Sequence, residues 1–160
     1  MQVRAATPDD ATAIQAVAAA AWRDTYAGLL RPETIETFIE RAYSSERIVR
    51  RIEADTFLLA VEDDSVVAFA DALSQGDDVG LMAIYARPES RGRGVGTALL
   101  TELQALFPGR AVVAEVLLGN RKGEAFYERR GFEVGETIEE DLFGERVVER
   151  RWRLVGTLPG

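Results

Sequence analysis

The chain has 160 residues, of which 47% are hydrophobic and 29% charged, so it is long enough to bury the core of one domain. Its 19 Lys and Arg residues against 27 Asp and Glu residues give a net charge of −8, which argues against nucleic-acid binding. The acidity favours a cationic partner, although solubility alone explains it equally well. The absence of Cys and His excludes disulfides, thiolate zinc sites, an acyl-cysteine and a catalytic histidine.

Neither a leader nor a membrane anchor is indicated. The first residues do not join a basic segment to an apolar one, and no apolar run approaches the ~20 residues that span a bilayer. We therefore expect a cytoplasmic protein that does not bind membranes and that forms a single domain over residues 1–160.

Hydrophobic periodicity and turn signals predict the elements of the first half of the chain. A short strand over 3–6 is followed by Thr-Pro-Asp-Asp at 7–10, which is typical of a helix start. Apolar residues then recur on one helical face to about Tyr26. The remaining elements are helices over about 33–41 and 44–53 and a hairpin of strands at 57–61 and 66–70.

The second half contains a strand-helix-strand unit and a closing hairpin. The unit consists of a strand over 79–86, a helix over 96–107 and a strand over 111–117. A helix over 124–130 ends at Gly131, and the hairpin pairs 132–138 with 146–154. These elements predict an α/β fold of the α+β mixed-sheet type, with helices on both faces.

The most informative segment is the loop between the strand and the helix of this unit. Its three glycines are Gly92, Gly94 and Gly96. Without a Cβ, glycine lets backbone N–H groups approach an anion, and the start of a helix favours phosphate. Arg91 and Arg93 add positive charge. We favour phosphate binding over a tight turn alone.

A dinucleotide-binding loop is the main alternative. Glu115, about twenty residues downstream, suits the acidic residue that binds a ribose in that fold. The third glycine of that fingerprint would fall at Thr97, however, and its strand normally opens the domain, whereas more than eighty residues precede this loop. We therefore disfavour a nicotinamide or flavin site.

The segment 91–96 also fits the pattern Arg/Gln-x-x-Gly-x-Gly/Ala, and here the chain resembles the GNAT superfamily of acyl-CoA N-acyltransferases. The order of elements is that of the family. Asn120, Phe126-Tyr127 and Gly131-Phe132 resemble its second signature, although Gly123 and Glu124 depart from the usual residues. The resemblance implies a mostly antiparallel sheet with a parallel strand pair at the coenzyme A site.

The resemblance implies acetyl-CoA as co-substrate, with no metal. Its diphosphate is expected on the loop, at Arg91, Gly92, Arg93, Gly94, Val95, Gly96 and Thr97. Its pantetheine arm is expected beside the strand that precedes the loop, where Ile84 and Ala86 offer backbone groups and Tyr85 faces the other way. Asn120 would hydrogen-bond the pantetheine; capping of the following helix is the equally weighted alternative.

The resemblance also suggests the catalytic groups. Tyr127 stands where many members keep a tyrosine that protonates the leaving thiolate, although it also suits packing of helix against sheet. Glu115 interrupts an apolar strand and is the leading candidate for the base, with a salt bridge to an arginine as the alternative. Asp71 is the second candidate. Tyr26 is expected to line the acceptor pocket, whereas Trp22 suits the core.

The function that follows is transfer of an acetyl or related short acyl group from acetyl-CoA directly to a primary amine, either of a small molecule or of a peptide N-terminus. A non-catalytic module that binds acyl-CoA is the alternative. The acidic run at 139–141 would attract a cation, but such runs are more often simply solvated. Homodimers are common in the family, and no interface is indicated here.

Overall fold

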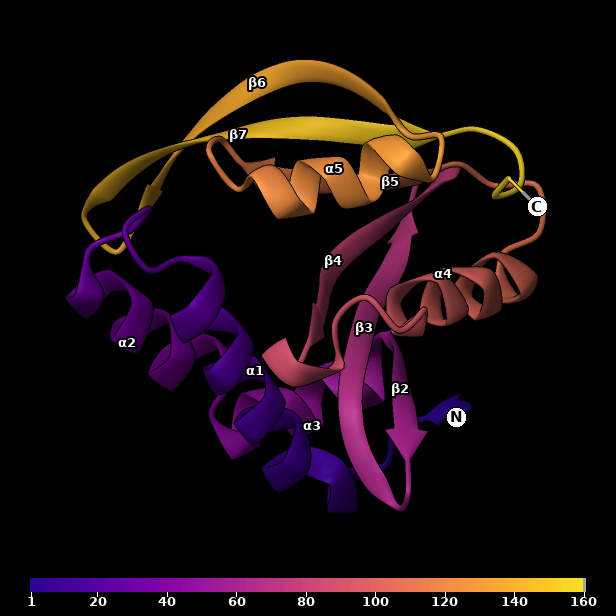
Figure 1. Cartoon of the computed structure of the whole chain (residues 1–160), viewed down its shortest axis with the longest axis horizontal. Coiled ribbons are helices and arrows are strands. Elements are labelled where there is room, and N and C mark those ends of the chain that lie inside the picture. The colour runs from indigo at the N-terminus through magenta and orange to yellow at the C-terminus, as the bar shows by residue number, and fades with distance from the viewer. Residues whose placement is uncertain (160) are drawn as a thin grey trace.

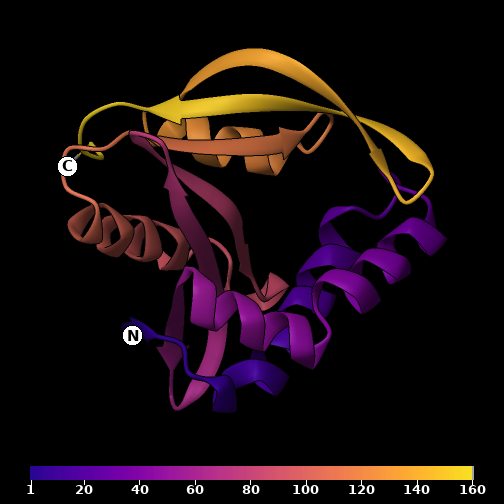
Figure 2. The same ribbon diagram turned by 180° about the vertical axis from the view of Figure 1, so that it is seen from behind.

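A seven-stranded mixed sheet organises the chain, and helices cover both of its faces (Figures 1 and 2). The computed structural model describes residues 1–159. The strands are β1 (Gln2–Ala5), β2 (Thr56–Glu62), β3 (Ser65–Gln75), β4 (Asp78–Ala86), β5 (Val112–Leu117), β6 (Glu133–Leu142) and β7 (Glu145–Leu154). Their order is β1-β2-β3-β4-β5-β7-β6, with only β4 and β5 parallel. The predicted fold class is confirmed.

The sheet separates two hydrophobic clusters. The α-helices are α1 (Ala11–Thr25), α2 (Pro32–Ala42), α3 (Ser45–Ala54), α4 (Val95–Leu106) and α5 (Arg121–Arg129). Helices α1 to α3 pack on one face, where Ile14, Trp22 and Ile48 are buried, and α4 packs on the other through Leu99 and Leu103. Within residues 1–159, no helix combines the length and the hydropathy that a membrane crossing requires.

Helix α5 and strand β3 both extend beyond their predicted bounds. Helix α5 begins at Arg121 rather than 124, since the Asn120 side chain accepts a hydrogen bond from the Gly123 amide at 3.0 Å and caps the helix. Glycine suits position 123 because a Cβ there would lie 2.5 Å from the side-chain amide of Asn120. Strand β3 continues to Gln75 because β4 pairs with it along that length.

Strands β4 and β5 separate soon after they begin. They pair at only three positions, the last of which joins Leu81 to Ala114. On the other side of β4, Leu81 and Ala83 face consecutive residues of β3, so Met82 is the extra residue of a β-bulge. A bulge bends a strand and increases its local twist. The second half of β4 therefore diverges from β5.

Asp71 in β3 is buried beneath α3. Its Oδ2 accepts a hydrogen bond from Arg51 Nε at 2.8 Å, and its side chain is 2% exposed. The Arg51 guanidinium also lies 4.6 Å from the centre of the Tyr43 ring. Burial, together with the neighbouring Asp55, raises the pKa of Asp71 to about 7, although Arg51 acts in the opposite direction.

Replacement of Asp71 by Asn should flatten the pH dependence of unfolding. The folded-state pKa of about 7 exceeds the ordinary value of 3.8, so the contribution of this carboxyl to stability is complete below 3.8 and is lost as the pH rises through 7. We expect the drop in unfolding free energy between about pH 5 and about pH 8, measured in urea, to be smaller in Asp71→Asn. The exposed Asp77→Asn is the control, and an unaltered drop in Asp71→Asn would contradict this account.

Candidate active site

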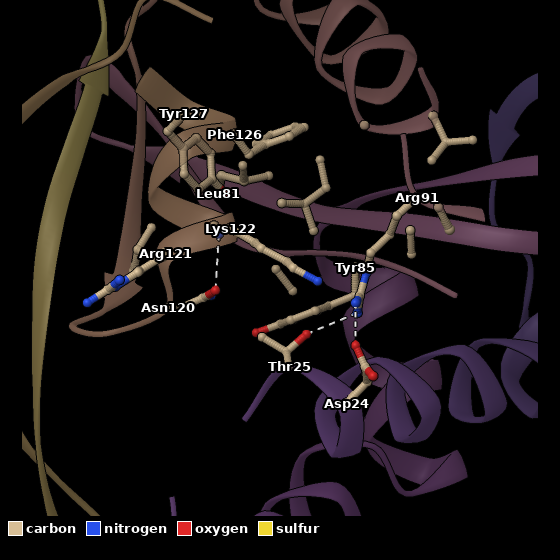
Figure 3. A pocket seen from close by; sticks show the side chains of 18 of the residues that line it. Asp24, Thr25, Leu81, Tyr85, Arg91, Asn120, Arg121, Lys122, Phe126 and Tyr127 are labelled. Atoms are coloured by element: carbon tan, nitrogen blue, oxygen red, sulfur yellow. Dashed lines mark hydrogen bonds and ion pairs between the residues drawn. The ribbon is translucent and has the colours of Figure 1, made fainter. Parts of the chain in front are cut away.

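The divergence of β4 from β5 opens into a cleft of about 730 Å³. The loop before α4, the start of α5 and the end of α1 border it (Figure 3). This volume is typical of small-molecule sites. The predicted site residues that line it are Tyr26, Ile84, Tyr85, Ala86, Arg91, Gly92, Gly94, Val95, Gly96, Glu115, Asn120 and Tyr127. The fold thus brings most of the predicted site residues together in one cleft.

Three predicted residues lie outside the lining of this cleft. Arg93 is ion-paired with Glu62 at 2.8 Å, on the side of the loop that faces β2. The Thr97 hydroxyl accepts a hydrogen bond from Arg130 Nε at 2.9 Å. Asp71 is buried against α3, where it is ion-paired with Arg51. In each case a partner distant in sequence determines where the side chain lies.

The loop before α4 presents backbone donors to the cleft. Gly92 and Gly94 have φ values of 74° and 82°, in the left-handed region that favours glycine. Gly94 is the N-cap of α4, so the first N–H groups of that helix have no intrahelical acceptor. Together with the helix dipole, these groups form a site that suits a phosphate.

Gly96 is needed for packing rather than for its backbone conformation. A Cβ at this position would lie 2.5 Å from Cε1 of Phe126 in α5, so the aromatic ring occupies the space that a side chain would take. Arg130 lies over the same ring, with its guanidinium carbon 3.7 Å from the ring centre. This contact joins the start of α4 to α5.

Positive side chains reach the cleft from both ends of α5. Arg121, Lys122, Arg129 and Arg130 line it, and sequence reasoning missed all four. Their clustering within the segment 121–130 that follows Asn120 is the signal that would have found them. In a chain of net charge −8, this concentration of cations suits the phosphates of coenzyme A.

Arg91 lines the cleft opposite α5, but its guanidinium contacts α1. Nη1 is ion-paired with the carboxylate of Asp24, and Nη2 donates to the Thr25 hydroxyl at 3.0 Å (Figure 3). The loop is therefore tied to the last turn of α1.

The end of β4 has two different faces. Ile84 and Ala86 pack toward the cluster that contains α4, whereas Tyr85 packs toward the cluster of α1 to α3. The Tyr85 hydroxyl lies 2.8 Å from that of Tyr26, which is 7% exposed. Burial raises the pKa of both hydroxyls, that of Tyr26 to about 12. Two neutral hydroxyls thus form one wall of the cleft.

Tyr127 both packs in the core and lines the cleft. It is 6% exposed and makes edge-to-face contacts with Phe126 and Phe132, at centre-to-centre distances of 5.2 and 5.0 Å. Burial raises its pKa well above the ordinary value, so the hydroxyl stays protonated at neutral pH. A neutral hydroxyl at this position is able to donate a proton.

Three carboxylates from separate strands meet beside the cleft. Oxygens of Glu115 in β5, Glu140 in β6 and Glu149 in β7 lie within 4.8 Å of one another, close enough to share one cation. Burial, then Glu140, raises the pKa of Glu149 to about 7. Glu115 lines the cleft but is exposed and ion-paired with Arg151 at 3.1 Å, as one sequence alternative predicted. Glu149 was missed, because only strand register brings it to Glu115.

Residues 14–132 match the model of the acetyltransferase (GNAT) family. The chain therefore belongs to this family, which confirms the resemblance of its loop and second signature, and it is an acetyltransferase. It is 27% identical over 158 residues to the spermidine N(1)-acetyltransferase of Thermoplasma acidophilum, a match that covers 93% of this chain and 98% of that one. A probable N-acetyltransferase of Mycobacterium tuberculosis is 22% identical, with coverage of 99% and 96%.

Solved structures of the family share the fold. The PaiA N-acetyltransferase of T. acidophilum, crystallised in complex with coenzyme A, superposes with a TM-score of 0.80 at 26% identity, covering 93% of this chain and 96% of that one. The ribosomal-protein-S18-alanine N-acetyltransferase of Escherichia coli superposes with a TM-score of 0.73 at 19% identity, covering 99% and 96%. At that identity the second match concerns the fold alone.

A methyl group at residue 96 should weaken the contact between α4 and α5. Because the Phe126 ring fills the space of a Cβ, Gly96→Ala should lower the unfolding free energy by about 1–3 kcal/mol and weaken coenzyme A binding. Adding Phe126→Leu should restore part of the stability. Thermal unfolding and calorimetric titration measure both effects, and a Gly96→Ala variant that melts like wild type would show that Phe126 does not require this glycine.

Proposed function

We propose that this chain transfers the acetyl group of acetyl-CoA to a primary amine of a small, multiply charged cation of the polyamine class. The observation that carries the proposal is that side chains of both charges lie at the cleft. Arg121, Lys122 and Arg129 line it, and so does Glu115, with Glu140 and Glu149 beside Glu115. An anionic co-substrate and a cationic acceptor therefore each have complementary groups.

The relatives support this choice among amines. The spermidine N(1)-acetyltransferase of T. acidophilum matches this chain over nearly its whole length, and the spermidine in its name is a polyamine. A peptide N-terminus carries a single ammonium group, whereas a polyamine offers a second cation to the carboxylates. A small polyamine is therefore a better fit than a peptide N-terminus.

The residues present suit acetyl-CoA. The N–H groups at Gly94, Val95 and Gly96 would hold its diphosphate, with the cations of α5 beside them. The unpaired edge of β4 at Ile84 and Ala86 would hold the pantetheine. Asn120 is also available, because its cap of α5 uses only Oδ1.

The chemistry is direct transfer, since there is no Cys to carry an acyl group. A carboxylate, Glu149 or Glu115, takes the proton of the ammonium group, and the neutral nitrogen forms a bond to the thioester carbon. A backbone N–H at 84–86 donates to the carbonyl oxygen as its negative charge grows. The carbon–sulfur bond breaks, Tyr127 gives its proton to the sulfur, and the second proton that the nitrogen loses restores the Tyr127 hydroxyl. The products are the N-acetylamine and coenzyme A.

A panel of amines tests the substrate class. We expect spermidine to be acetylated with a kcat/KM at least about tenfold higher than that of a monoamine of similar length or an alanine-initiated peptide, because only a polyamine has a second ammonium group. Release of coenzyme A thiol measures the rate. Equal values for the three acceptors would contradict the polyamine assignment, and no thiol release with any amine would contradict amine transfer.

Removal of the Tyr127 hydroxyl should slow chemistry without weakening binding. Tyr127→Phe keeps the ring contacts with Phe126 and Phe132 but loses the proton donor, so kcat should fall about 100-fold. The dissociation constant for coenzyme A should stay within about twofold of wild type. An unchanged kcat would remove Tyr127 from the mechanism.

The acidic limb of the pH–rate profile distinguishes the two candidate bases. A base acts only when deprotonated, so if Glu149 is the base, activity should rise as the pH increases through about 7, its raised pKa. Glu149→Gln should lose this limb and most of the activity, whereas Glu115→Gln should keep the limb. The reverse pattern would assign the base to Glu115.

A further inference from the structure

The loop arginine has an anionic partner within the protein itself. Arg91 belongs to the phosphate-binding loop, yet its guanidinium is ion-paired with Asp24 and donates to Thr25 (Figure 3). Both partners lie in the last turn of α1, where the helix dipole also favours a cation. The phosphate-binding loop and the last turn of α1 therefore share the guanidinium of Arg91.

The same turn of α1 reaches the acceptor side of the cleft. Tyr26 follows Thr25 directly, and its hydroxyl meets that of Tyr85 on the cleft wall. Asp24 and Thr25 line the cleft as well. One side chain, Arg91, thus joins the phosphate loop to the wall that an amine would meet.

The ion pair is suited to exchange of partners. The Asp24 side chain is 50% exposed and that of Arg91 is 30% exposed, and pairs of this kind contribute little to folding stability. A diphosphate carries more charge than one carboxylate, and its oxygens accept paired hydrogen bonds from a guanidinium. Exchange of Asp24 for a diphosphate on the same loop therefore costs little interaction free energy at Arg91.

We propose that Asp24 is a positioning residue that competes with the diphosphate of acetyl-CoA for Arg91, so that acetyl-CoA binding frees the Asp24 carboxylate for the ammonium groups of the acceptor. The competition for Arg91 requires only coenzyme A binding, whereas the link to the acceptor rests on the proposed function. By linkage, each substrate then increases the affinity for the other by the same factor.

A double-mutant cycle with coenzyme A as the probe tests the competition. Calorimetric titration compares wild type, Asp24→Asn, Arg91→Gln and the double variant. We expect Asp24→Asn to bind coenzyme A about threefold more tightly than wild type, because Arg91 no longer has to leave a carboxylate. Arg91→Gln should bind more weakly, and Asp24→Asn should have no further effect in that background.

A matched control separates competition from net charge. Glu46 also forms an exposed ion pair with an arginine, Arg50 on α3, and does not line the cleft. Glu46→Gln removes the same charge and should leave coenzyme A affinity unchanged. The proposal is overturned if Asp24→Asn binds coenzyme A no more tightly than wild type, or if it has the same effect with Gln at position 91.

Titration of spermidine in the presence and absence of coenzyme A tests the link to the acceptor. Wild type should bind the amine several-fold more tightly when coenzyme A is present, and Asp24→Asn should lose that difference. If the cycle with coenzyme A behaves as expected but no amine binds, the link fails together with the proposed function. If amines are acetylated but the cycle shows no coupling, only the competition fails.

Discussion

The early separation of β4 from β5 is the constraint on which the site depends. Parallel pairing stops at Leu81 and Ala114, and the bulge at Met82 bends the remainder of β4 away. The cleft therefore runs along an unpaired strand edge and ends at the glycine loop that starts α4. Backbone donors, rather than side chains, thus form the part of the site that would meet the diphosphate and the thioester.

The charges around the cleft differ from the net charge of the whole chain. The net charge is −8, yet four cationic side chains from Arg121 to Arg130 line the cleft, and three carboxylates gather at Glu115. Tyr26 and Tyr127 line the cleft with neutral hydroxyls, because burial raises their pKa values. Groups of both charges are thus available for the two substrates that we propose.

Sequence patterns predicted the features that depend on local chemistry. Periodicity placed the helices and strands, and the glycine spacing located the loop, because turns and helix starts are determined by neighbouring residues. Contacts between distant segments were not predictable. Arg93 pairs with Glu62, and Glu149 meets Glu115 only through strand register. The partner of Arg91 belongs to the same class, since 67 positions separate it from Asp24.

We propose that coenzyme A lies along the end of β4 with its diphosphate on the loop before α4. Residue-resolved NMR titration with coenzyme A tests it most directly, because amide shifts report backbone contacts at individual residues. We predict that the largest changes occur at residues 84–86 and 92–97, and that NAD at the same concentration produces no comparable changes there. Large changes confined to other residues, or an equal response to NAD, would contradict the account.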